Sequence, residues 1–363
     1  MKDRYAPLEA RLAALKAAGL RRELLALEPT SATTARAGTE TLTVFCSNDY
    51  LGLASHPEVK RAFAGGGAGS ARLVSGNRPA HAALEDALSE RFGRPATLFG
   101  SGYAANLGLL TTVLQRGEPV VSDALNHASL IDGLRLSGAE RRIAPHGGDP
   151  ALLPGARLAV TESLFSMDGD LARLTNWTGA HWLAVDEAHA VGALGPAGRG
   201  HAAATGVEPD FLVGTLGKAY GAAGAFVVGP PALRELLVST ARSFVYTTGL
   251  PEGVAQAALV GLRLADDERR ARLAANSSRL RAGLRQIGAQ VLGEAHILPV
   301  LTGERTMEVA RSLRKAGIFA PGIRYPTVPR GLERVRFTAS SEHSHEQIDR
   351  CVEAMALALR SPG

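Results

Sequence analysis

Lys218 is the residue whose type and setting point most directly to chemistry. The chain carries 40 Lys and Arg residues, of which five are lysines: Lys2, Lys16, Lys60, Lys218 and Lys315. Lys218 stands alone between Lys60 and Lys315, among Gly, Ala and Leu residues. Arginine cannot deprotonate and attack a carbonyl, so an amine kept in this arginine-rich chain indicates a nucleophile or a proton acceptor.

An acidic residue and a histidine follow a predicted buried strand. Asp186 comes directly after residues 181–185, and His189 lies three residues further on. A carboxylate at the end of a buried strand needs a cationic partner or hydrogen bonds. Taken alone, the pair is equally consistent with a capping Asp and a packed His.

The run Asp186-Glu-Ala-His189 also resembles a helicase box, which would make the protein a nucleotide hydrolase. That function requires a phosphate-binding Gly-x-x-x-x-Gly-Lys-[Ser/Thr] loop. Here Gly217-Lys218 is followed by Ala219, and Leu212 occupies the place of the first glycine. The sequence therefore excludes this alternative.

Three further features supply contacts that a phosphorylated aromatic ligand would need. Gly100-Ser101-Gly102-Tyr103 joins a predicted strand to a helix, whose free N–H groups suit a phosphate. Thr215, three residues before Lys218, offers a hydroxyl for the same phosphate, and His127 offers a ring that can stack on an aromatic face. Each alone is also typical of an ordinary turn, a surface hydroxyl or a structural histidine.

Together these residues offer an anion cradle, a stacking ring, a carboxylate, a partner for a phenolic oxygen and an amine. Pyridoxal 5'-phosphate (PLP) needs that whole set for its phosphate, pyridine ring and aldehyde. The sequence therefore predicts a PLP enzyme in which Lys218 binds the aldehyde as a Schiff base.

Short apolar runs alternate with helical stretches and predict an α/β fold, with a mostly parallel central sheet flanked by helices. The residues above fall at the ends of predicted strands, where ligands bind in open parallel sheets. We expect strands at 41–46, 96–99, 119–122, 157–161, 182–185, 211–213 and 225–228. We expect helices at 4–27, 79–92 and 103–114, and long helices over 250–286 that are interrupted near Asp266.

We expect three parts: an N-terminal helix and short strand over 1–45, a large PLP-binding domain over 46–245, and a smaller α+β C-terminal domain over 246–363. A length of 363 residues with 45% hydrophobic content allows a large core. The connection between Ile143 and Val160 is short, and so is the connection between Asp170 and Asp186. The second leaves little room for a helix to cover one face of the sheet.

Composition excludes several classes of partner. The net charge of +5 fits an arginine-rich surface or attraction for an anionic substrate. The basic residues are scattered without a nucleic-acid-binding module, and no apolar run could span a bilayer, so we expect no nucleic acid or membrane partner. Cys46 and Cys351 form neither a disulfide framework nor a metal spacing, so we expect a cytoplasmic protein without a metal.

The ordered motifs resemble those of the α-oxoamine synthases, PLP-dependent transferases of fold type I. The matching stretches run through most of the chain and include Ser47-Asn-Asp-Tyr-Leu-Gly-Leu53, Ser101-Gly-Tyr-Ala-Ala-Asn106, His127-Ala-Ser129, Thr161-Glu-Ser-Leu-Phe-Ser-Met-Asp-Gly169, Asp186-Glu-Ala-His189, Thr215-Leu-Gly-Lys218 and Tyr325-Pro-Thr-Val-Pro329. The resemblance implies an acyltransferase that joins an amino acid to an acyl-CoA or acyl-carrier-protein thioester and releases carbon dioxide. It also implies a homodimer, in which Thr247 and Thr248 would reach the partner's phosphate.

The resemblance assigns roles to individual positions. The implied catalytic residues are Lys218, His127, Asp186 and His189: Lys218 carries the cofactor and moves the α-proton, Asp186 pairs with the pyridine nitrogen, His127 stacks on the ring, and His189 contacts a ring substituent. The other implied cofactor contacts are Gly102, Tyr103, Ser166 and Thr215. The implied substrate contacts are Asn48, His127 and Arg336 for the amino acid, and Arg21 and Thr327 for the acyl group.

Alternatives remain for the substrates and for the reaction. The run Gly322-Ile-Arg-Tyr-Pro-Thr-Val-Pro329 favours family members that use alanine and a pimeloyl thioester in biotin biosynthesis. Tyr325 instead resembles members that use glycine and succinyl-CoA, and glycine or serine with another acyl-CoA remains open. Outside the family, a PLP aminotransferase or lyase would need no acyl thioester, and a binding or scaffold protein would keep the fold without activity.

Overall fold

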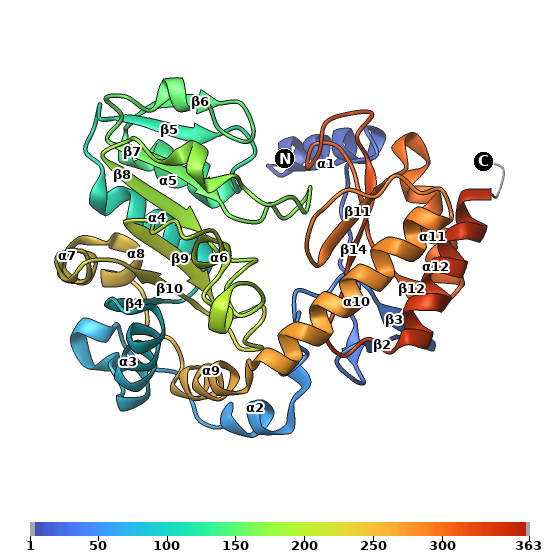
Figure 1. Ribbon diagram of the computed structural model, residues 1–363, viewed down its shortest axis with the longest axis horizontal. Coiled ribbons are helices and arrows are strands. Elements are labelled where there is room, and N and C mark those ends of the chain that lie inside the picture. Colours follow the sequence, from blue (N-terminus) through green and yellow to red (C-terminus); the bar gives the residue numbers. More distant parts are fainter. Residues whose placement is uncertain (1–3, 361–363) are drawn as a thin grey trace.

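A seven-stranded sheet forms the centre of the larger of two lobes, which we call the sheet lobe (Figure 1). The computed structural model describes residues 4–360. Every strand except β10 runs in one direction, so the predicted α/β fold with a mostly parallel sheet is confirmed. In spatial order the strands are β4 (Ala96–Phe99), β10 (Ala225–Val228), β9 (Phe211–Thr215), β8 (Trp182–Asp186), β7 (Leu158–Glu162), β5 (Pro119–Asp123) and β6 (Glu140–Ala144).

Helices cover the two faces of this sheet. Because successive side chains of a strand point to opposite faces, alternate residues of each strand enter different cores. On one face, strand residues such as Val160 and Val213 pack with α4 (Gly102–Val113), α5 (Ala128–Ser137), α7 (Pro231–Thr240) and α8 (Arg242–Val245). On the other face lie α2 (Pro57–Ala62), α3 (Pro79–Phe92), α6 (His201–Thr205) and α9 (Glu252–Leu264).

The small lobe joins both ends of the chain (Figure 1). One of its sheets has the order β1 (Glu28–Pro29), β2 (Thr34–Ala37), β3 (Glu40–Val44) and β12 (Ile318–Phe319), so N-terminal strands pair with a C-terminal one. The other sheet contains β11 (Ile297–Leu301), β14 (Arg334–Thr338) and β13 (Gly322–Ile323). Its helices are α10 (Asp267–Gln286), α11 (Thr306–Lys315) and α12 (His345–Arg360). The domain boundaries expected from the sequence stay a prediction.

Local sequence explains most of the element ends. The expected interruption near Asp266 is confirmed, because α9 ends at Leu264 and the Asp266 side chain accepts a hydrogen bond from Arg269 N (2.8 Å) to begin α10. The expected helix over 4–27 is wrong beyond its first half. The first helix, α1, spans Ala6–Ala17, and Gly19 with φ +65° adopts the left-handed conformation that ends helices.

The expected gap in helical cover is also present. Between Asp170 and β8 the chain forms only a short 3₁₀ turn, Leu174–Trp177. Trp177 is fully buried and packs with Leu153, Phe165 and other side chains against the β5, β7 and β8 residues of that face. One large ring therefore fills part of the space that a helix would cover.

An ion-pair cluster ties the two short segments together. His146 Nδ1 lies 3.0 Å from Asp123 Oδ1, and His146 Nε2 lies 2.8 Å from Asp170 Oδ2. The two carboxylates raise the pKa of His146 to about 10. The imidazolium thus links the end of β5 to the loop after residue 169.

Across the described part of the chain, residues 4–360, no helix has the length and apolar character needed to cross a membrane.

Replacing His146 with Gln should lower the thermal unfolding midpoint most at pH 6 and progressively less as the pH approaches 10. Since folding raises the pKa of His146 from 6.5 to about 10, its stabilising effect is complete below about pH 6.5 and is lost as the pH rises through about 10. Thermal unfolding of both proteins across this range measures the difference. The exposed His181, replaced by Gln, is the matched control, and a loss of midpoint independent of pH would contradict this account.

Candidate active site

Polar residues gather where the central strands end. Glu162 ends β7, Asp186 ends β8 and Thr215 ends β9, and Glu162 and Asp186 are direct neighbours in the parallel ladder. All three side chains are buried. Parallel strands bring their carboxyl ends to the same edge of the sheet, where ligands bind in this architecture. The sheet therefore converges on a polar edge, which we call the strand-end site.

Asp186 is held rigidly in this site. Its Oδ2 accepts a hydrogen bond from Asn106 Nδ2 (2.7 Å), and its Oδ1 accepts one from Ala188 N (2.9 Å). Burial and the nearby Asp186 carboxylate raise the pKa of Glu162 well above its ordinary value. The setting of Glu162 therefore favours its protonated form beside Asp186.

Lys218 reaches the same site from the turn after β9. Its side chain is half-buried, and burial lowers the pKa of its amine to about 8, against the opposing effect of Asp186. Within residues 4–360, no hydrogen bond or ion pair engages the amine. An amine with a lowered pKa and no committed partner is available as a nucleophile or a base near neutral pH.

His127 presents its ring at the mouth of the site. As the residue that caps α5, it accepts a hydrogen bond from Ser129 N on Nδ1 (3.2 Å), which leaves the proton of the neutral ring on Nε2. Partial burial lowers the pKa of His127 despite the attraction of Asp186. Tyr103 packs its ring edge-on against His127, with 6.4 Å between the centroids. The neutral ring thus lies fixed and solvent-accessible beside Asp186 and Lys218.

A buried chain of polar contacts joins His189 to the small lobe. Tyr50 Oη lies 2.6 Å from His189 Nδ1 and 3.2 Å from Asn48 Oδ1. Arg336, on β14, contacts Asn48 at 3.5 Å and donates from Nε to the backbone oxygen of Ser166 (2.6 Å). Burial lowers the pKa of His189 well below its ordinary value, so the ring is neutral and its position depends on Tyr50.

Arg336 is a buried cation without a carboxylate. It is 6% exposed, and its contacts in the described chain are the neutral oxygens of Asn48, Ser166 and Thr338. Arg334, two residues earlier on the same strand, instead pairs with Asp168 at 2.6 Å. A buried guanidinium that lacks a counter-ion is suited to an anionic ligand.

The expected phosphate contacts also lie close together. A Cβ placed on Gly102 would approach Thr215 Cγ2 to 3.0 Å, so the start of α4 lies directly against the end of β9 and a side chain at residue 102 would require Thr215 to shift by a few tenths of an ångström. Thr215 itself donates a hydrogen bond to Ala188 O (3.2 Å). Thr247 and Thr248 line a small cavity of the same chain together with Gly100. Their expected contact with a partner subunit stays a prediction.

The arrangement of the residues in the strand-end site fits PLP. The buried Asn106 Oδ1 has no hydrogen-bond partner in the described chain, the Lys218 amine is uncommitted, and Asp186 supplies a fixed negative charge between them. The N-terminus of α4 offers N–H groups for a phosphate. Lys218, Asp186, His127 and the start of α4 could therefore hold the aldehyde, ring nitrogen, ring face and phosphate of one cofactor.

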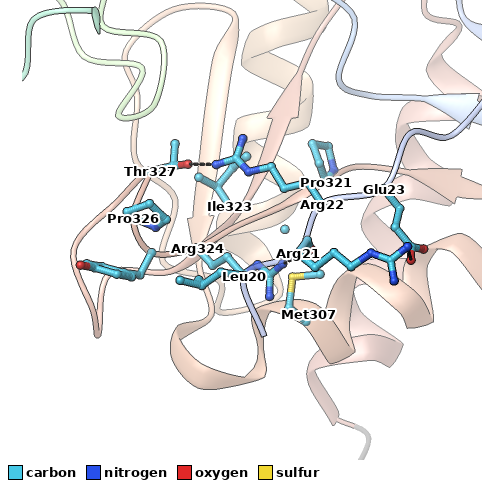
Figure 2. A pocket seen from close by; sticks show the side chains of 12 residues that line it. Leu20, Arg21, Arg22, Glu23, Met307, Pro321, Ile323, Arg324, Pro326 and Thr327 are labelled. Atoms are coloured by element: carbon cyan, nitrogen blue, oxygen red, sulfur yellow. Dashed lines mark hydrogen bonds and ion pairs between the residues drawn. The ribbon is translucent and has the colours of Figure 1, made fainter. Parts of the chain in front are cut away.

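Arg21 and Thr327 lie in a separate pocket. A cavity of about 490 Å³ lies between residues 20–23 and residues 321–327 (Figure 2). Arg22 donates a hydrogen bond to Thr327 Oγ1 (3.1 Å), while Arg21 lies 3.5 Å from Glu23. We call this cavity the arginine pocket. None of the interactions seen in residues 4–360 joins it directly to Lys218.

Sequence reasoning missed three residues of the strand-end site: Tyr50, Asn106 and Glu162. All three lie inside motifs that the sequence singled out, but only the fold shows which side chains of a motif point inward. Glu162 carried the same signal as Asp186, an acidic residue ending an apolar strand. Among residues 4–360, no group of three or more His, Cys, Asp or Glu side chains could hold a metal ion.

The chain is similar to known proteins over most of its length. The family model "Aminotransferase class I and II" matches residues 40–355. A curated relative from Halorhodospira halophila, named 8-amino-7-oxononanoate synthase, is 46% identical over an alignment that covers 98% of this chain and 95% of the relative.

Solved structures are similar over the same length. Serine palmitoyltransferase from Sphingomonas wittichii has a TM-score of 0.91 and 32% identity, and the match covers 99% of this chain and 98% of that one. A structure described as SPT with a PLP internal aldimine has a TM-score of 0.90 and 29% identity, with 99% of each chain covered. 8-Amino-7-oxononanoate synthase from Francisella tularensis has a TM-score of 0.76 and 27% identity, covering 87% of this chain and 97% of that one.

Reconstitution with PLP should produce the absorption band of a Schiff base in the wild-type protein but not in Lys218→Arg. Because burial lowers the pKa of the Lys218 amine to about 8, the rate of linkage should rise with pH around a midpoint near 8. Absorption after mixing apoprotein with PLP measures the rate, and borohydride reduction followed by peptide mass spectrometry identifies the modified lysine. Lys60→Arg is the control, and a cofactor attached to any other lysine would refute the assignment.

Proposed function

The chain belongs to the aminotransferase class I and II family, and we propose that it joins L-alanine to a pimeloyl thioester to give 8-amino-7-oxononanoate, a step of biotin biosynthesis. The observation that carries this proposal is the near full-length similarity to relatives that bear the name of this activity. The same similarity confirms the resemblance to PLP-dependent acyltransferases. The reaction forms a bond between the α-carbon of alanine and the thioester carbonyl, and it releases the thiol carrier and carbon dioxide.

We propose that Arg336 and Asn48 bind the amino acid by its carboxylate. Arg336 has a buried positive charge without an acidic partner in the described chain, and Asn48 lies beside it. Arg336 also donates a hydrogen bond to Ser166 O, and this contact holds the guanidinium toward the sheet lobe. A carboxylate bound there would leave the amino group and α-carbon of alanine toward Lys218, whose pKa the same guanidinium helps to lower.

We propose that Lys218 moves the α-proton. When bound, PLP supplies an electron sink that stabilises negative charge at the α-carbon. Asp186 is placed to keep a positive charge on the ring nitrogen, and the neutral His127 ring is placed to cover the ring face without adding a competing charge. The Lys218 amine, with a pKa of about 8, accepts a proton near neutral pH and can return it later in the cycle.

We further propose that Tyr50 orients His189 so that His189 can form a hydrogen bond with the cofactor. Gly102, Tyr103 and Thr215 would hold the phosphate end, and Ser166 would lie at the edge of the ring. Tyr103 is itself tied to Asp132 through its hydroxyl, which steadies the first turn of α4. The arginine pocket, with Arg21, Arg22 and Thr327, would take the acyl thioester. Its cationic side chains suit the phosphates or carboxylate of that substrate.

We propose a homodimer whose interface lies beside the phosphate end of the site. A bridge between Ala71 and Thr248 brings residues 71–74 beside residues 246–248, and this surface exposes Leu73, Val74 and Tyr246. A contiguous exposed apolar patch is typical of an interaction surface. A second copy seated there would bring Thr247 and Thr248 toward its phosphate site.

We also propose a cytoplasmic location, where Cys46 and Cys351, both free thiols, stay reduced.

The purified enzyme with PLP should convert L-alanine and a pimeloyl thioester to 8-amino-7-oxononanoate, releasing equal amounts of carbon dioxide and free thiol. Mass spectrometry identifies the product, and a thiol assay gives the rate. Glycine and serine should react more slowly with the same thioester. Preference for glycine with succinyl-CoA would move the assignment to another α-oxoamine synthase, and consumption of alanine without a thioester would favour an aminotransferase or lyase.

Replacing Arg336 with Gln should raise KM for alanine roughly 10- to 100-fold, as expected for loss of a charge-assisted hydrogen bond. KM for the thioester should change little, because that substrate would bind in the arginine pocket. Steady-state kinetics with each substrate varied in turn separates the two. Arg336→Lys keeps the charge but loses the planar donors, so its effect should be intermediate. An equal rise in both KM values would indicate a general loss of structure instead.

A further inference from the structure

The helix α1 lies on the surface with an unpartnered apolar stripe. Every residue of α1 is exposed. Leu8, Leu12 and Leu15 are 67%, 52% and 40% exposed, and their spacing places them on one face of the helix. An isolated helix of about 12 residues is marginal in water, and its stability normally comes from packing of an apolar face. The stripe is therefore a surface that is suited to a partner.

Basic side chains flank this stripe. Arg11 lies one turn from Leu15, and Lys16 lies one turn from Leu12. From residue 4 to residue 22 the chain carries five basic residues and a single acidic one, Glu9. Within residues 4–360, neither Arg11 nor Lys16 forms a hydrogen bond or an ion pair through its side chain. An apolar stripe edged by free cations complements an acidic surface that carries apolar residues of its own.

The stripe is continuous with the arginine pocket. A groove of about 440 Å³ is lined by Leu12 and Leu15 of α1 together with Leu20, Arg21, Arg22 and Pro326. The last four residues also line the arginine pocket, shown in Figure 2. A partner seated on α1 would therefore stand at the entrance of the cavity that we assign to the acyl thioester.

We propose that α1 is the docking surface for an acidic carrier protein, which delivers the acyl group into the arginine pocket on a flexible thioester arm. This inference rests on the proposed function, because it assigns the source of the same thioester. A second copy of the chain is a poorer occupant. A two-fold contact of α1 with itself would bring its basic residues together, and like charges across an interface are unfavourable.

The test compares two thioesters of pimelate, one on an acidic acyl carrier protein and one on CoA, with the full-length PLP enzyme. Both carry the same acyl group, but only the carrier protein is large enough to cover α1. The double variant Arg11→Glu/Lys16→Glu should raise KM for the carrier-protein thioester about tenfold and leave KM for the CoA thioester within about twofold. With the wild type, added salt should raise KM for the carrier-protein thioester more steeply than KM for the CoA thioester.

The matched control is Lys60→Glu/Arg61→Glu. These are also a Lys and an Arg, exposed in the last turn of α2, which lies at the opposite end of the molecule from α1 in Figure 1. An unchanged KM for the carrier-protein thioester in the α1 variant would overturn the proposal. So would equal rises for both thioesters, or a change in sedimentation mass that identified α1 as a contact between copies. Failure of the wild type with both thioesters would instead refute the proposed function.

Discussion

The negative charge of Asp186 at the end of β8 is the constraint around which the rest of the site is arranged. Two hydrogen bonds fix its oxygens, and burial together with this carboxylate raises the pKa of the neighbouring Glu162 well above its ordinary value. The Lys218 amine lies in the opposing fields of Asp186 and Arg336, and burial decides the balance in favour of a lowered pKa. Asp186 likewise opposes the lowered pKa of His127, so burial outweighs the attraction of the same anion at both positions.

Strand β14 of the small lobe contacts the sheet lobe beside this site. Arg334 and Arg336 point the same way from β14, because they are two residues apart. Arg334 binds Asp168 and Met167 O, and Arg336 binds Ser166 O. One arginine therefore forms a structural ion pair that fixes the strand, while its neighbour keeps its charge free of any described carboxylate. A displacement of the lobes would move the free guanidinium relative to Lys218, so the amino-acid site that we propose depends on how the lobes are joined.

The sequence predicted six of the seven strands of the central sheet and the polar residues Asp186 and Thr215 at two of their ends, since apolar strands, Gly turns and strand-end polar residues are local signals. It did not predict β6 (Glu140–Ala144) or the role of Glu162 at the end of β7. It did not predict that α1 ends at Ala17, because leucines at helical spacing continue past the left-handed Gly19. Nor could it predict that Arg22 contacts Thr327. That pairing depends on how two segments 305 residues apart approach each other, and adjacent arginines are equivalent in sequence.

The two short segments reduce the cover of the sheet without removing a residue of the strand-end site. The strand-end residues need the register of β5, β7 and β8 more than they need a helix over one face. Asn126 fixes that register directly: its side chain donates to Val160 O (2.9 Å) and accepts from Glu162 N (3.1 Å), on either side of the β7 end. Trp177 then fills space on the sheet face that lacks a helix, and His146 links the end of β5 to the loop after residue 169. Since positioning comes from backbone pairing and a side-chain clamp, the helical layer on this face could shorten without moving a residue of the strand-end site.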